Sequence, residues 1–332
     1  MKLRETITAV QRRLFSRWIH LAQLIVVFLL LVPLAANAYE LVLGTGEAGT
    51  FSSFSGRVLC RTIDQQVPDV TCVTRTAADG IDHLTNVQNG SLDLAIIDSQ
   101  ILLEAMTKSG VFRYVDINYD NLNIFMPLYD LPMGIIVRND AGISTLNDLK
   151  GKRINAGSLI SDQHQALEMV MAAKGWLSSD FERFEELSSS FSQDTMAFCH
   201  GTVQAMMNRG VHPTVSVQRL LVNCKAHLLP MDDADIDKLV AGNPSLWKTT
   251  VLADSYPAKS RKVVTFGTRA ILIGSGDMDQ KTAYAIVKAL YTNKEQLQRS
   301  HQSLSLYPVA TARQGIDGLT MHPGAEQFFT EQ

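Results

Sequence analysis

The run Tyr39-Glu40-Leu41-Val42-Leu43 is followed at once by Gly44-Thr45-Gly46-Glu47-Ala48-Gly49-Thr50-Phe51. A short run of apolar and β-forming residues that stops at glycines predicts a strand ending in a tight loop. The next amphipathic stretch, which includes residues 56–65, is predicted to be a helix. A strand that leads through a glycine-rich loop into a helix is the first unit of an α/β fold.

The same alternation of short β-forming runs and longer amphipathic runs continues along the chain. Further strands are predicted at residues 70–75, 94–97, 133–137, 153–155, 205–207, 226–229 and 263–266. Helices are predicted at residues 80–89 and 163–174, and Gly175 follows the second as a helix C-cap requires. Such alternation predicts parallel βαβ units with helices on both faces of each sheet.

Two segments interrupt this alternation of strand and helix patterns, and both are predicted to cross between two lobes. They are Leu128-Tyr129-Asp130-Leu131-Pro132 and residues 259–268. We therefore expect a two-lobed α/β protein in which two crossing strands join two small doubly wound sheets. Lobe 1 is predicted to comprise residues 39–130 and 266–332, and lobe 2 is predicted to comprise residues 131–265.

The first 38 residues have the pattern of a secretory signal peptide. Residues 1–17 carry five basic side chains against Glu5, residues 21–36 are apolar apart from Gln23, and Ala36-Asn37-Ala38 offers small residues for cleavage. The alternative is an uncleaved membrane anchor. The apolar run contains Pro33 and is shorter than the roughly 20 residues that a spanning helix needs, so we favour cleavage and a periplasmic protein.

Composition excludes several classes of protein. The chain has 332 residues, of which 46% are hydrophobic and 19% charged, which rules out a disordered, collagen-like or coiled-coil protein. It holds 30 Lys and Arg against 33 Asp and Glu, and removal of residues 1–38 leaves a net charge of −7. This acidic balance argues against a nucleic-acid partner. The chain contains no nucleophile elbow, H-E-x-x-H motif or paired-carboxylate motif, so we expect no enzyme activity, cofactor or metal.

The four cysteines are disulfide candidates, because an exported chain meets an oxidising compartment. Cys60 and Cys72 are 12 positions apart, and Cys199 and Cys224 are 25 positions apart. Sequential pairing is the favoured arrangement. A zinc site is the alternative, since Cys199, His200, His212, Cys224 and His227 are close in sequence and of the types that bind zinc. None of their spacings is the short kind typical of zinc sites.

The loop at residues 44–51 formally matches the dinucleotide motif G-x-G-x-x-G. Against that interpretation, the second predicted strand ends at Arg75-Thr76 with no acidic residue for a ribose, and nicotinamide cofactors are not expected outside the cytoplasm. A bare tight turn or an anion-binding loop remains. The hydroxyl groups at its mouth favour an anion-binding loop.

Polar residues also follow other predicted strands. In open α/β sheets, ligands bind at these carboxyl ends of the strands. They occur at residues 75–79, 98–100, 158–164 and 208–210. Each alone is more typical of a helix cap or a turn. Their convergence at one edge of the fold would form a ligand site.

An ordered set of motifs spanning nearly the whole mature chain resembles the TAXI family, the solute-binding proteins of one branch of TRAP transporters. The motifs are residues 44–51, Gly90-Ser91-Leu92-Asp93-Leu94-Ala95, Leu128-Tyr129 with Val137-Arg138, residues 146–153, His212-Pro213, His322-Pro323-Gly324-Ala325 and the two cysteine pairs. The resemblance implies a type II periplasmic-binding-protein fold that clamps a small organic anion, such as glutamate or 2-oxoglutarate, between its lobes. It also implies delivery to the membrane subunits of a TRAP transporter. We expect a monomer; a sensor or a receptor for a different importer remains the alternative.

Within that fold, two sets of residues are candidates for the two ends of the ligand. Thr45, Thr76 and the backbone of residues 46–51 would hold one carboxylate, and Ser158, Gln163 and Arg209 would close on the other end from lobe 2. Phe51 would stack on the aliphatic part. Asp98 would pair with an ammonium group of an amino acid, or else cap a helix. The full candidate set is Thr45, Gly46, Thr50, Phe51, Thr76, Ala77, Asp98, Ser99, Ser158, Gln163, Asn208 and Arg209.

Overall fold

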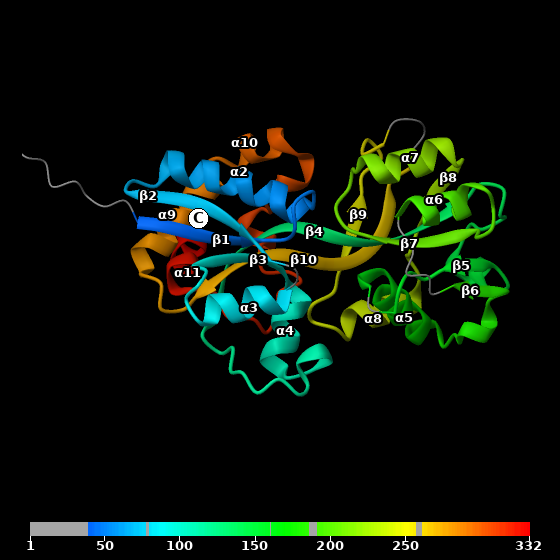
Figure 1. The fold of residues 1–332 in the computed structure, drawn as a ribbon, viewed down its shortest axis with the longest axis horizontal. Helices are drawn as coiled ribbons and strands as arrows, with labels where there is room; N and C mark the ends of the chain where they lie inside the picture. The colour runs from blue at the N-terminus through cyan, green and yellow to red at the C-terminus, as the bar shows by residue number, and fades with distance from the viewer. Residues whose placement is uncertain (1–38, 78–79, 160, 186–190, 257–260) are drawn as a thin grey trace, which may run out of the picture. The chain divides into compact units, whose positions relative to one another are not determined.

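Two long antiparallel strands, β4 (Leu122–Arg138) and β10 (Val263–Ser275), link two groups of shorter strands (Figure 1). Leu131 of β4 lies opposite Thr268 of β10, so the two segments predicted to cross between lobes are paired with each other. Beyond this crossing, β4 continues into the second group of strands from Met133 onward. The protein is therefore a two-lobed α/β protein joined by two crossing strands, as predicted.

The computed structural model describes residues 39–77, 80–159, 161–185, 191–256 and 261–332. The predicted signal peptide and residues 259–260 of the second crossing segment lie outside the described residues. Within the described part of the chain, no helix has both the length and the apolar character needed to cross a membrane.

Lobe 1 is built on a mixed sheet with the strand order β2-β1-β3-β10-β4. Its shorter strands are β1 (Tyr39–Thr45), β2 (Val70–Thr76) and β3 (Leu94–Asp98), and β9 (Trp247–Val251) pairs with the start of β10. Strands β1 and β3 are parallel, but β10 is antiparallel to both β3 and β4. The prediction of parallel βαβ units was therefore wrong at the crossing strands. These two strands are antiparallel because the chain leaves lobe 1 along β4 and returns to it along β10.

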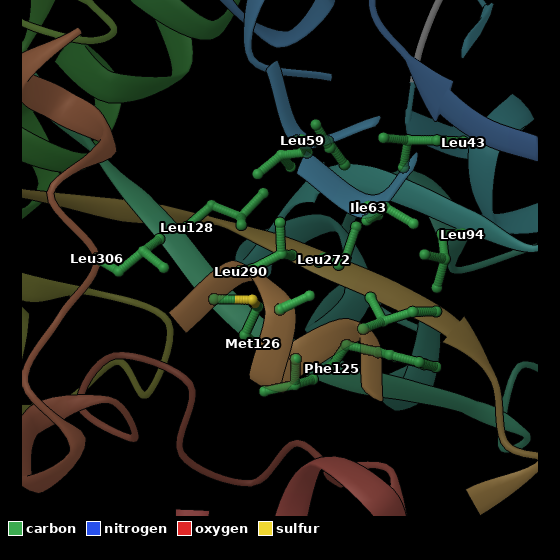
Figure 2. Packing of buried hydrophobic residues seen from close by; sticks show 14 of the residues in the cluster. Leu43, Leu59, Ile63, Leu94, Phe125, Met126, Leu128, Leu272, Leu290 and Leu306 are labelled. Atoms are coloured by element: carbon green, nitrogen blue, oxygen red, sulfur yellow. The ribbon is translucent and has the colours of Figure 1, made fainter. Parts of the chain in front are cut away.

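Helices cover both faces of this sheet because apolar side chains alternate along its strands. Leu94 and Ile96 of β3 face one cluster of buried residues, whereas Ala95 and Ile97 face another. The first cluster contains the helices α2 (Phe51–Gln66), α9 (Gln280–Thr292), α10 (Lys294–Ser300) and α11 (Pro323–Thr330). The second contains α3 (Gly80–Gln88), α4 (Ser99–Thr107) and the short helix η1 (Gly110–Phe112). Figure 2 shows the first cluster, in which Leu59 and Ile63 of α2 lie near Leu272 of β10.

Lobe 2 repeats the arrangement around the second part of β4. Its other strands are β5 (Arg153–Asn155), β6 (Arg183–Glu185), β7 (Ala205–Arg209) and β8 (Ala226–Leu229). Ile135 and Val137 pack with the helices α5 (Asp162–Lys174) and α8 (Ala234–Ala241), whereas Ile136 packs with α6 (Phe191–Cys199) and α7 (Val215–Asn223). The short helices η2 (Leu146–Leu149), η3 (Ser178–Asp180), η4 (Gln302–Leu304) and η5 (Val309–Thr311) complete the described elements.

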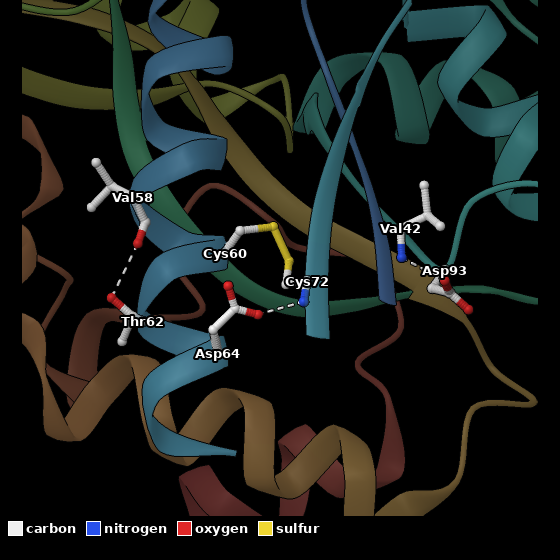
Figure 3. Close-up of a disulfide and its surroundings, with 7 residues drawn as sticks. All are labelled: Val42, Val58, Cys60, Thr62, Asp64, Cys72 and Asp93. Carbon is white, nitrogen blue, oxygen red and sulfur yellow. Dashed lines mark hydrogen bonds between the residues drawn. A yellow bond between two sulfur atoms is a disulfide. The ribbon is translucent and has the colours of Figure 1, made fainter. Parts of the chain in front are cut away.

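Two disulfides connect neighbouring elements, in the sequential pairing. Cys60 of α2 is bonded to Cys72 of β2 across a Cα–Cα distance of 4.9 Å (Figure 3). Cys199 at the end of α6 is bonded to Cys224 at the end of α7 across 4.6 Å. Both distances lie within the usual range for a disulfide. Because Cys199 and Cys224 are bonded to each other, neither offers the thiolate that the alternative zinc site requires.

Candidate functional site

A cavity of about 460 Å³ lies between the two lobes, where elements of both lobes meet. A cavity of this size is typical of a small-molecule site. Lobe 1 and the crossing strands supply Thr50, Phe51, Ser52, Ile96, Ile97, Asp98, Tyr129, Leu131 and Ala270. Lobe 2 supplies Asp162, Asn208, Arg209, Gly210, Val211, Thr214 and Ser216.

The N-termini of four helices reach this cavity. Thr50 caps α2 by accepting from the Ser53 N–H, and Asp98 caps α4. In lobe 2, Asp162 is the first residue of α5 and Thr214 caps α7. The first N–H groups of a helix have no partner within the helix, and the helix dipole is positive at that end. Two of these ends already carry an acidic side chain, Asp98 or Asp162, so the ends of α2 and α7 are the ones that favour an anionic group on a ligand.

Arg209 occupies the centre of a charged cluster at the end of β7. Its Nη2 contacts Asp98 Oδ2 and donates to Thr268 Oγ1 at 2.8 Å, while its Nη1 lies 2.8 Å from Asp162 Oδ2. Burial works to lower the pKa of Arg209, but the two carboxylates outweigh it and raise the pKa above its usual value. The cluster therefore holds a permanent cation against two acidic side chains.

Asp98 serves both as a helix cap and as a partner of Arg209. Its Oδ1 accepts from the Gln100 N–H at 2.9 Å, and its Oδ2 also accepts from Thr268 Oγ1 at 2.8 Å. The side chain is 12% exposed. Both carboxylate oxygens are thus engaged within the protein. Asp98 therefore caps a helix, which was the alternative to pairing with an ammonium group of a ligand. Its side chain also lines the cavity.

Aromatic rings form part of the apolar lining. The Phe51 ring lies 4.8 Å from the Tyr129 ring, edge to face, and 4.7 Å from the His301 ring. Burial raises the pKa of Tyr129 to about 12, so its hydroxyl stays neutral. The cavity therefore combines a charged cluster with an aromatic surface. Such a combination suits a small ligand that has an anionic group and a short carbon chain.

The structure brings five of the predicted site residues together around the cavity. These are Thr50, Phe51, Asp98, Asn208 and Arg209. The other seven are not among the residues that line it: Thr45, Gly46, Thr76, Ala77, Ser99, Ser158 and Gln163. A ligand contact at any of these positions stays a prediction.

Most of the second group make contacts inside the protein instead. The Thr45 side chain is fully buried and its carbonyl accepts from the Ala77 N–H, while the Gly46 N–H donates to Ser52 Oγ. Ser99 is also fully buried and accepts from the Arg269 N–H. Their polar groups help to shape the loops that position the cavity.

The candidate set left out several lining residues: Ser52, Tyr129, Asp162, Thr214 and Ser216. Of these, Ser52 is one of the hydroxyl residues at the mouth of the predicted loop, and Asp162 lies in the polar stretch 158–164. Thr214 precedes the apolar run of α7 as an N-cap does, and Asp162 follows the N-cap Ser161, so helix-start patterns could have identified both. Tyr129 lay in the segment predicted to cross between lobes. Its position in the cavity depends on the pairing of β4 with β10.

Replacing Thr50 with alanine is expected to lower the free energy of unfolding by about 1 kcal/mol, because the hydroxyl caps the first turn of α2. Thr50→Ser is the matched control, since serine keeps the capping oxygen. Guanidinium unfolding curves of both variants measure the difference. Equal losses in the two variants would show that the lost methyl group, and not the cap, matters.

A model of the NMT1-like family matches residues 43–332 of this chain. Among solved structures, a TctC solute binding protein from Polaromonas is 15% identical, with a TM-score of 0.55 over 81% of this chain and 88% of that chain. The periplasmic aliphatic sulphonate binding protein SsuA from Escherichia coli is 17% identical, with a TM-score of 0.49 over 89% of this chain and 84% of that chain. At such identities, the Polaromonas structure shows a shared fold.

Proposed function

Because this chain belongs to the NMT1-like family, we propose that it is an extracytoplasmic solute-binding receptor that captures a small organic anion between its two lobes. Membership of a family within the periplasmic solute-binding superfamily supports a binding role rather than catalysis. The two disulfides fit an extracytoplasmic location. In this proposal, residues 39–130 and 266–332 move as one lobe and residues 131–265 as the other.

The observation that carries the proposal is the meeting of Arg209 with four helix N-termini in one cavity between the lobes. Each of these groups stabilises negative charge, and they come from both lobes. An anion bound there would contact both lobes at once. It would therefore stabilise a closed arrangement relative to an open one, as in hinge closure around a ligand.

The ligand is proposed to be a glutamate-like amino acid or a 2-oxoglutarate-like dicarboxylate. Arg209, Asn208 and the N-terminus of α7 would hold one carboxylate, and the first turn of α2 with Thr50 would hold the other. Phe51 would pack on the carbon chain. The dicarboxylate is favoured over the amino acid, because both oxygens of Asp98 are already engaged and an ammonium group would have to compete for them.

The partner is proposed to be the membrane subunits of a TRAP transporter, on the strength of the ordered motifs that resemble the TAXI family. The receptor would act as a monomer and release its ligand on docking. A ligand sensor or a receptor for another importer is the second candidate, since the same cavity would serve it. A gene neighbourhood with large and small membrane subunits favours transport.

A thermal-unfolding screen of residues 39–332 tests the binding role. The protein is refolded to remove carried-over ligand and heated with amino acids, 2-oxo acids, dicarboxylates and sugars. At 100 times its dissociation constant a ligand stabilises by about 2.7 kcal/mol, which raises the midpoint by roughly 5 °C in a protein of this size. We expect this shift with 2-oxoglutarate or L-glutamate and none with sugars. A shift with sugars alone would contradict the proposal.

A further inference from the structure

The two carboxylates that contact Arg209 are anchored very differently. Asp98 is 12% exposed, and its oxygens also accept from Gln100 and Thr268. Asp162 is 67% exposed, and within the described part of the chain Arg209 is the partner that its side chain contacts. Asp98 is therefore fixed by several bonds, whereas Asp162 is held by a single ion pair and can turn outward into solvent.

Arg209 also retains hydrogen-bonding capacity. Both contacts of Nη2, to Asp98 and Thr268, belong to the fixed part of the cluster. Nη1 is occupied by Asp162. The Nε atom is buried and has no hydrogen-bond partner among the described residues. A guanidinium group has five N–H donors, so the cluster leaves at least the Nε–H of Arg209 without an acceptor among the described residues.

We propose that the Asp162 carboxylate competes with the ligand for Arg209. It pairs with Arg209 Nη1 before the ligand binds, and an anionic group of the ligand replaces it in that ion pair on binding. This proposal rests on the proposed function and adds a residue that sets ligand selectivity. The exposed carboxylate gives up one ion pair and gains full hydration when it leaves. Asp98 stays in place and keeps Arg209 oriented.

The exchange makes the charge of the ligand a requirement for binding. A neutral ligand that displaced Asp162 would leave Arg209 without its second anionic partner, and a buried cation with missing partners is costly. An anionic ligand restores the partner. The exchange also limits affinity, because every ligand must first compete with a carboxylate that is already present at the site.

Isothermal titration calorimetry with L-glutamate and 2-oxoglutarate tests the exchange on residues 39–332. We expect Asp162→Asn to bind the accepted anion about tenfold more tightly than the wild type, because the competing charge is gone. The helix cap of α5 is the side chain of Ser161, so this variant keeps it. Glu168→Gln is the matched control: it removes the same charge from an exposed position of the same helix, where the side chain contacts His164.

Each outcome decides one question. Tighter binding by Asp162→Asn with unchanged binding by Glu168→Gln supports the exchange. Equal tightening by both variants would show that only the overall charge of α5 matters and would overturn it, as would wild-type affinity in Asp162→Asn. If no protein binds either anion, and the unfolding screen also finds no anion, the proposed function itself fails. The thermal-unfolding midpoint of Asp162→Asn is measured to check that this variant is folded.

Discussion

Replacing Arg209 with methionine is expected to abolish anion binding and to lower the free energy of unfolding by at least about 3 kcal/mol. The methionine side chain fills similar space but carries no charge. It leaves Asp98, which is 12% exposed, without its cationic partner. Removal of one partner from a buried ion pair costs about 3 to 5 kcal/mol, because the other charge stays buried. Calorimetric titration and guanidinium unfolding measure the two effects.

A double variant separates the two consequences of losing Arg209. Arg209→Met combined with Asp98→Asn removes both charges. The asparagine Oδ1 can still accept from the Gln100 N–H, and its Nδ2 can donate to Thr268 Oγ1, which takes over the place of the second carboxylate oxygen. We expect this double variant to recover most of the lost stability but none of the anion binding. Recovery of binding would show that Asp98, and not Arg209, controls the site. Wild-type stability in the single variant would show that the ion pair contributes nothing.

The elements that the sequence predicted well are those determined by local pattern. Residues 94–97 and 205–207 form strands close to the predicted bounds, and Gly175 ends α5 with a left-handed conformation. Asp98 and Arg209 could be identified because they belong to the polar residues after the predicted strands, and in the structure they are the last residues of β3 and β7. Helices cover both faces of each sheet because apolar residues alternate along the strands, and this alternation is visible in the sequence.

Features that depend on long-range pairing could not be predicted. The first part of β4, from Leu122, was missed, because its partners in β10 lie far along the chain. Strand β9 was also missed, although its partners in β10 begin only 12 positions after its last residue. The glycine-rich loop was predicted to bind an anion directly. Its Thr45 is fully buried and its Gly46 N–H donates to Ser52, whereas Thr50 and Phe51 line the cavity, so anion binding by this loop stays a prediction. A sequence shows which polar groups a loop has but not which of them the fold uses internally.

Arg269 is the clearest example of a residue whose environment only the fold explains. It is fully buried, and its guanidinium group lies 3.7 Å from the ring centre of Trp247 and 3.8 Å from that of Tyr307. It also lies near Asp130, which is opposite it on β4. Contacts of a cation with two aromatic faces in a buried site are stabilising. Its contact residues lie 22, 38 and 139 positions away, so no local pattern indicates them.

Strand β10 connects this buried cluster to the charged cluster at the cavity between the lobes. Thr268 bonds to Asp98 and Arg209, while its neighbour Arg269 contacts Asp130. Successive residues of a strand point to opposite faces. The two positions therefore contribute to the charged cluster around Arg209 on one face and to the crossing of the lobes on the other. A change in the pairing of β4 with β10 would act on both, which gives the proposed ligand binding and the proposed lobe movement a common structural element.

Wild-type protein is expected to lose stability as the pH falls below about 6.5, in part because His212 is buried without a charge. The residue is 8% exposed, and burial lowers the pKa of its imidazole from 6.5 to about 4. In the unfolded chain the imidazole takes up a proton near pH 6.5, whereas in the folded protein it stays neutral until about pH 4. The unfolded state therefore binds more protons in this range, and stability is lost as the pH falls.

The contribution of His212 is isolated by comparison with His212→Gln. The difference in unfolding free energy between wild type and this variant is expected to shrink by about 2 to 3 kcal/mol between pH 7.5 and pH 4.5, since a shift of one pKa unit corresponds to about 1.4 kcal/mol. Other titrating groups are present in both proteins and cancel in the difference.

Tyr256→Phe is the control, because it removes the hydroxyl that contacts His212 Nδ1 but keeps the imidazole. We expect Tyr256→Phe to follow the pH dependence of the wild type. A difference between wild type and His212→Gln that is the same at both pH values would contradict the prediction, because it would mean that the imidazole takes up its proton equally easily in the folded and unfolded protein.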